Sequence, residues 1–166
     1  MRFRNLSPAL VVLLVLVAGS AAAQTDADGE ALTPPPAPTD PCAEGPAQYR
    51  AGNFVESRKL FLDCLEQNGD QVEILLPLAV MGVREGRPAE AMDFGARAVE
   101  VDPEDPEARY WYGRALLENG RPDEAKRQWE QGLQLDLGHL GILEGLSRMA
   151  LTEGETAKAY QLLTQL

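Results

Sequence analysis

The sequence predicts an all-α fold, a solenoid of about four helix–turn–helix units. One observation is that four glycines, Gly52, Gly86, Gly120 and Gly154, stand at one constant interval. A second is that a small residue follows each of these glycines by five positions, namely Ser57, Ala91, Ala125 and Ala159. A constant period of this length is typical of repeat proteins in which each unit buries its apolar face against its neighbour.

The signals that start and stop helices agree with this period. Pro88 and Pro122 stand where the first turn of a helix needs no N–H donor. The glycines before them, Gly86 and Gly120, can adopt the left-handed conformation that ends a helix. The expected helices cover residues 43–51, 54–67, 72–84, 88–101, 106–118, 122–135, 140–152 and 155–165.

Two helices carry residues that disturb a helix. The first contains Gly45 and Pro46, so we expect it to be short or frayed. Pro77 lies inside the third, and we expect a kink there. The small residues that follow the turn glycines are expected where the two helices of a repeat cross closely.

Residues at fixed positions of the repeat carry a resemblance to a known family. The clearest unit runs from Pro106 to His139 and contains Tyr112-Gly113, Leu116, Gly120, Ala125, Trp129 and Gly132. These units resemble tetratricopeptide repeats. The resemblance covers a domain at residues 42–166, with repeats at about 42–71, 72–105, 106–139 and 140–166. It implies a right-handed superhelical solenoid that binds proteins or peptides in a concave groove lined by the first helix of each repeat.

The resemblance also implies which residues face that groove, and two arginines stand out among them. Arg114 and Arg148 hold the same position in adjacent repeats, and two guanidinium groups side by side could hold a carboxylate or an extended peptide backbone. The alternative is that each arginine pairs with a nearby acid, such as Glu118 or Glu144. The expected groove residues are Leu76, Val80, Arg84, Tyr110, Arg114, Leu117, Glu144, Arg148 and Leu151.

The N-terminal residues 1–23 read as an export signal. Arg2 and Arg4 precede an apolar run, and Ala21-Ala22-Ala23 supplies the small residues of a cleavage site. We expect cleavage after Ala23, and hence a periplasmic protein in a Gram-negative source or a secreted one otherwise, with no membrane attachment. The alternative is that the segment is retained as an anchor, although its strongly apolar centre is short for a span of about 20 residues.

Residues 24–41, QTDADGEALTPPPAPTDP, form the expected linker between the signal and the domain. The segment contains five prolines and a single leucine, so it cannot bury enough apolar surface to offset its ordering entropy. We expect a disordered, Pro-rich spacer. Triple proline can also serve as a ligand for an aromatic groove.

Charge and cysteine content narrow the function classes. The chain carries 26 acidic and 15 basic residues, for a net charge of −11. Such a surface repels nucleic-acid phosphates and anionic lipids, so we expect neither as a partner. Cys42 and Cys64 form an even pair in an exported chain, which predicts a disulfide. The alternative is two buried thiols.

No arrangement of residues predicts catalysis, a metal or a cofactor. His139, the single histidine, lies at a junction between repeats, and we expect it to face solvent. Asp102, Glu104 and Asp105 lack the spacing of a calcium loop. We therefore expect a non-enzymatic protein without a cofactor.

The last helix offers a further candidate contact. Leu162, Leu163 and Leu166 lie on a face that no following repeat of the given sequence covers, and an uncovered apolar strip commonly marks a protein contact. We expect a second copy of the chain or another partner there, so a homodimer is one prediction. The alternative is that the tail folds back over the strip.

Together these patterns predict a scaffold or adaptor of the cell envelope that binds a protein or peptide. The rival hypothesis is a membrane-tethered assembly or biogenesis factor that retains residues 1–23. The length of the mature polypeptide distinguishes the two.

Overall fold

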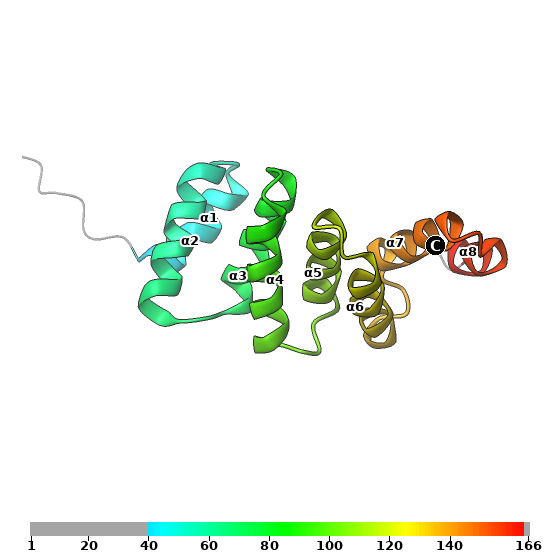
Figure 1. Cartoon of the computed structure of the whole chain (residues 1–166). Coiled ribbons are helices and arrows are strands. Elements are labelled where there is room, and N and C mark those ends of the chain that lie inside the picture. Colours follow the sequence, from blue (N-terminus) through cyan, green and yellow to red (C-terminus); the bar gives the residue numbers. More distant parts are fainter. Residues whose placement is uncertain (1–39, 165–166) are drawn as a thin grey trace, which may run out of the picture. The chain divides into compact units, whose positions relative to one another are not determined.

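The structure, a computed structural model, describes residues 40–164, which fold into eight α-helices (Figure 1). The helices are α1 (Pro41–Arg50), α2 (Phe54–Asn68), α3 (Val72–Arg84), α4 (Pro88–Val101), α5 (Pro106–Glu118), α6 (Pro122–Leu135), α7 (Leu140–Thr152) and α8 (Thr156–Leu163). Each odd-numbered helix packs against the helix that follows it. The predicted all-α repeat fold is confirmed, and no helix end differs from its expected position by more than two residues.

Several predictions concern residues that the structure does not describe. The expected export signal, most of the expected linker and Leu166 lie outside residues 40–164. The last two residues of the expected linker, Asp40 and Pro41, are described. The Asp40 carboxylate accepts the N–H of Cys42 at 3.0 Å and so caps α1, in which Pro41 is the first residue. α1 therefore begins at Pro41, inside the expected linker, and it is a short, capped helix of 10 residues.

Glycines end the first helix of every repeat in the same way. Gly52, Gly86, Gly120 and Gly154 all have positive φ angles, between 69° and 83°. After Gly86, the N–H of Arg87 donates to the carbonyl of Gly82 at 2.8 Å, and after Gly120 the N–H of Arg121 donates to that of Leu116 at 2.9 Å. These bonds satisfy carbonyl groups that a helix end would otherwise leave unpaired. The constant period of the sequence is thus fixed by one recurring turn.

The small residues that follow these turns lie at the helix crossings, as predicted. Ser57, Ala91, Ala125 and Ala159 are all buried, with at most 1% of each exposed. In the second repeat, a Cβ atom added to Gly82 of α3 would come within 2.8 Å of the Ala91 Cβ on α4. The expected kink at Pro77 does not divide α3, which continues through this residue.

A disulfide closes the first repeat. Cys42 at the start of α1 is bonded to Cys64 in α2, across a sequence separation of 22 residues. Cys64 is fully buried, and Cys42 packs against the same core cluster as Phe61 and Leu75. The structure therefore has the bridge rather than two free thiols. The bridge holds α1, a short helix that contains Pro46, against α2.

The first helices of neighbouring repeats are not equally spaced. The backbones of α3 and α5 pack directly against each other, whereas those of α5 and α7 do not approach in this way. This difference in helix spacing follows from the residue at one position of the repeat. In α4 the residue is Gly95, where an added Cβ would come within 3.0 Å of the Tyr112 backbone in α5. The equivalent residue of α6, one period later, is Trp129.

Trp129 separates α5 from α7. A Cβ added to Gly113 of α5 would come within 2.3 Å of the indole nitrogen, and one added to Gly145 of α7 within 2.7 Å of the six-membered ring. Only glycine leaves room for the indole on each side. Its N–H donates to the carbonyl of Tyr110 at 3.0 Å, and the side chain is 1% exposed. The indole therefore fills the space between the two helices and fixes their distance.

Removing the disulfide should destabilise the domain. We expect the Cys42→Ser, Cys64→Ser variant to lose about 3 kcal/mol of unfolding free energy, because a bridge across a loop of this length restricts the unfolded chain. Urea unfolding followed by circular dichroism measures the change, and reduced wild type serves as the control. An unfolding midpoint equal to that of the oxidised protein would contradict the stabilising role.

Gly113→Ala should displace the indole. Alanine favours a helix over glycine by about 1 kcal/mol, but its Cβ would overlap Trp129, and we expect a net loss of about 1–3 kcal/mol. Tryptophan fluorescence and thermal unfolding report the change. The control is Gly138→Ala, because a Cβ there meets only an Asp136 oxygen at 3.5 Å. Equal stability of the two variants would show that Trp129 is not tightly held.

Candidate interaction groove

A pocket opens between α5 and α7, beside the indole of Trp129. Its volume is about 240 Å³. The lining residues come from α5, α6 and α7, and they are Arg114, Leu117, Glu118, Trp129, Glu144, Gly145, Arg148 and Met149. The pocket therefore combines an apolar interior with four charged side chains. We call it the α5/α7 pocket.

Four of the nine predicted groove residues line this pocket. They are Arg114, Leu117, Glu144 and Arg148. Because Arg114 and Arg148 are separated by one period of the repeat, they occupy equivalent positions on α5 and α7, and the repeat brings both guanidinium groups to one cavity.

Each arginine also pairs with an acid on its own helix, which was the alternative drawn from the sequence. Arg114 contacts Glu118 at 3.3 Å, and Arg148 contacts Glu144 at hydrogen-bond distance. All four side chains line the pocket, so the pairing and the pocket coexist. The side chains of the second pair are 67% and 62% exposed. Exposed pairs of this kind contribute about 0.2–1 kcal/mol, so a ligand can replace them at little cost.

Arg114 is less exposed than Arg148, with 36% of its side chain accessible against 67%. Partial burial opposes the charge on its guanidinium, but the neighbouring side chains of Tyr110 and Glu118 outweigh this effect and raise the pKa of Arg114 above its usual value. The group therefore stays charged at every physiological pH. It presents a fixed positive charge at the α5 side of the pocket.

The other predicted groove residues are not in the α5/α7 pocket. Tyr110 packs its ring between Trp129 and His139, with ring centroids 6.4 and 5.2 Å away, and supports Arg114 from outside the lining. Val80 is 8% exposed and belongs to the core. Leu151 is 54% exposed on α7 and lines none of the cavities described in this section.

Arg84 lines a second, smaller pocket on the first helices. This cavity of about 80 Å³ lies between α1 and α3, beside the start of α2. Its lining residues are Tyr49, Phe54, Met81, Arg84 and Glu85. We call it the α1/α3 pocket. As with α5 and α7, the backbones of α1 and α3 do not pack directly, and an aromatic residue, Phe61, holds the position equivalent to Trp129.

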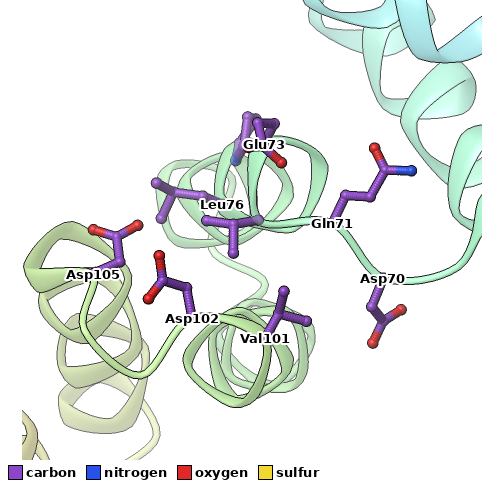
Figure 2. A pocket seen from close by; sticks show the side chains of 9 residues that line it. Asp70, Gln71, Glu73, Leu76, Val101, Asp102 and Asp105 are labelled. Atoms are coloured by element: carbon purple, nitrogen blue, oxygen red, sulfur yellow. The ribbon is translucent and has the colours of Figure 1, made fainter.

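Leu76 lies in a third, open and acidic cleft. The cleft has a volume of about 700 Å³ and is bordered by the start of α3, the end of α4 and the turn before α5. Figure 2 shows Leu76 and Glu73 on α3 near Asp102 and Asp105 of that turn, with Asp70 before α3. Within residues 40–164, no group of three or more histidine, cysteine or acidic side chains could hold a metal ion, and the cleft is no exception.

His139 does not face solvent, contrary to the sequence-based expectation. Its side chain is 11% exposed. Nδ1 accepts the N–H of Ile142 at 3.2 Å and so caps α7, while Nε2 lies 2.9 Å from the Glu107 carboxylate. The Glu107 carboxylate also accepts the indole N–H of Trp111 at 2.7 Å. The histidine therefore has a structural role at the junction between the third and fourth repeats.

Of the predicted C-terminal contact residues, Leu162 is buried and Leu163 is exposed. Leu162 is 8% exposed and packs in the same core cluster as Trp129 and Ile142, so it is not available on the surface. Leu163 is 45% exposed, and Tyr160, which was not among the predicted contact residues, is 71% exposed. The free apolar surface of α8 therefore centres on these two residues, and its contact with a second copy stays a prediction.

Comparison with known proteins places the chain in a family. Tetratricopeptide-repeat profiles match residues 42–106 and 113–166, and a further one matches residues 83–139. No curated protein sequence matches the chain closely enough to be counted as a relative.

Solved structures show the same fold. The crystal structure of YrrB, described as a TPR protein with an unusual peptide-binding site, is 23% identical with a TM-score of 0.67, and the match covers 75% of this chain and 64% of YrrB. MamA from Desulfovibrio magneticus RS-1 is 15% identical with a TM-score of 0.68, covering 75% and 71% of the two chains. The second TPR domain of human RPAP3, solved in complex with an HSP70 peptide, is 19% identical with a TM-score of 0.60, covering 66% and 91%.

These identities establish a shared fold and no more. Because the match reaches only 64% of YrrB, the likeness concerns part of that protein. The profile matches, which together span most of the described residues, show that the chain belongs to the tetratricopeptide-repeat family.

Proposed function

We propose that this protein is a non-enzymatic scaffold or adaptor that binds an extended segment of a protein partner at the α5/α7 pocket. The observation that carries the proposal is that Arg114 and Arg148, from equivalent positions of two repeats, line one cavity together with Leu117, Trp129 and Met149. Membership of the family supports a role in protein interaction, and YrrB and the RPAP3 domain are solved structures described with peptides or a peptide-binding site.

The size of the pocket favours a side chain over a whole small molecule. Sites for small molecules usually have volumes of about 300–1,000 Å³, whereas this pocket measures about 240 Å³. Its apolar lining consists of Leu117, Met149 and the almost fully buried Trp129, which suits an apolar group. A single apolar side chain of a peptide fills such a space.

The arginines suit the backbone or carboxylates of the same peptide. Each guanidinium has five N–H donors in a planar fork, and the Glu118 and Glu144 carboxylates engage only part of each fork. The remaining donors can bond peptide carbonyls or a carboxylate on either side of the inserted side chain. Such charge-assisted bonds are about twice as strong as neutral ones.

Export to the cell envelope is the second part of the proposal. It rests on the signal-like pattern of residues 1–23 and on the Cys42–Cys64 bridge, because disulfides persist mainly in oxidising compartments. No helix within residues 40–164 is long and apolar enough to cross a membrane. The rival candidate is a membrane-tethered assembly or biogenesis factor, in which residues 1–23 would be retained as an anchor.

Reversing the charge of both arginines tests the groove. We expect the purified wild-type protein to capture a partner from an envelope extract, and the Arg114→Glu, Arg148→Glu variant to lose it at unchanged helicity. The matched control is Lys59→Glu, Arg127→Glu, which makes the same charge change at exposed positions outside the pocket. Equal capture by the two double variants would show that the α5/α7 pocket is not the site.

The mature N-terminus tests export. We expect intact-mass measurement and N-terminal sequencing of the protein from its source to give a chain that begins at Gln24, in the fraction without membranes. A chain that keeps residues 1–23 and sediments with membranes would instead support the tethered factor.

A further inference from the structure

We infer that the partner segment carries two apolar side chains at least about six residues apart, a large one for the α5/α7 pocket and a short one for the α1/α3 pocket. This inference rests on the proposed function and deepens it, because it states the pattern that the bound segment must have. The evidence is the presence of two pockets of different sizes that share two positions of the repeat, with directly packed helices between them.

The two pockets are related by the repeat itself. Tyr49 of the α1/α3 pocket and Leu117 of the α5/α7 pocket are separated by two full periods of the repeat, and Met81 and Met149 are separated by the same interval. The two pockets therefore share these two repeat positions on the first helices. A segment that runs across the first helices can reach both.

The α1/α3 pocket carries an exposed aromatic residue. Phe54 is 42% exposed, and its ring meets that of Tyr49 edge-on, with centroids 5.5 Å apart. An aromatic side chain exposed to this extent beside a small apolar cavity gains stability when a further apolar group covers it, at about 25 cal/mol per Å² of buried area. The occupant expected here is therefore an apolar side chain rather than a charged one.

The helices between the two pockets pack closely. Gly95 lets α4 approach α5, and the backbones of α3 and α5 pack directly. The repeat position of Gly95 is occupied by Phe61 in α2 and by Trp129 in α6. The position is therefore aromatic in the repeats where the first helices are held apart, and it has no side chain in the repeat between them.

Helix spacing gives the distance between the two side chains of the partner. Packed helices lie about 8–10 Å apart. Two steps between first helices separate the pockets, and because neither α1 and α3 nor α5 and α7 pack directly, these steps together span at least about 20 Å. An extended chain advances about 3.3 Å per residue. The two side chains are therefore expected at least about six residues apart.

The two volumes set the size of each side chain. The α5/α7 pocket, at about 240 Å³, has three times the volume of the α1/α3 pocket, at about 80 Å³. The first has room for a side chain such as phenylalanine or leucine. The second has room for a short one such as valine or alanine, so the order of the two residues fixes the direction in which the segment binds.

Synthetic peptides test this pattern on the full chain. The probes are fluorescein-labelled peptides with one phenylalanine and one valine, separated by two to ten positions in a serine and asparagine background and made in both orders. Fluorescence anisotropy should show the tightest binding at one separation of about six or more, in one order only. The peptide with the best separation should bind at least tenfold more tightly than peptides with phenylalanine alone.

Two exposed residues of the first repeat supply matched variants. Phe54→Ser should reduce binding of the best peptide to the level of the phenylalanine-only peptide, and Val55→Ser, at a neighbouring side chain that is 87% exposed and outside the pocket, should have no effect. Affinity that does not depend on separation, equal effects of the two variants, or no binding by any peptide would overturn the inference. The proposed function would still stand if the arginine double variant alone lost the natural partner.

Discussion

The contact on which the interaction surface depends is the insertion of the Trp129 indole between Gly113 of α5 and Gly145 of α7. Close-packed interiors transmit a change in one side chain to the elements around it. Here the indole replaces the direct helix contact that α3 and α5 make across Gly95. The pocket that results is lined by two arginines and by apolar side chains. Trp129 therefore determines the shape of a binding surface although only 1% of it is exposed.

Most of the fold could be predicted because its signals are local. A turn glycine with positive φ, a proline at the first helical position and a small residue at the crossing are each specified within a few residues. Their recurrence at one constant interval makes the helix limits predictable to within two residues. The start of α1 lies at this limit, because Asp40 and Pro41 read as linker residues although together they form a cap.

The candidate site was less predictable, because it depends on distances between repeats. Family positions identified Arg114 and Arg148, but they treat the groove as continuous, whereas the structure places Val80 in the core and Leu76 in a separate acidic cleft. Glu118, Trp129, Gly145 and Met149 were missed as lining residues. The sequence does contain a signal for them. Phe61, Gly95 and Trp129 occupy the same repeat position, and the size of the residue there determines how closely the first helices approach each other.

A crystal structure of the Trp129→Leu variant tests most directly whether this residue opens the groove. Leucine keeps the site apolar, and it is the residue that α8 has at the equivalent position, 163. We expect α5 and α7 to move into direct contact, as α3 and α5 already are, and the pocket beside Arg114 and Arg148 to close. Helices that stay in place around an empty cavity where the indole had been would contradict this expectation.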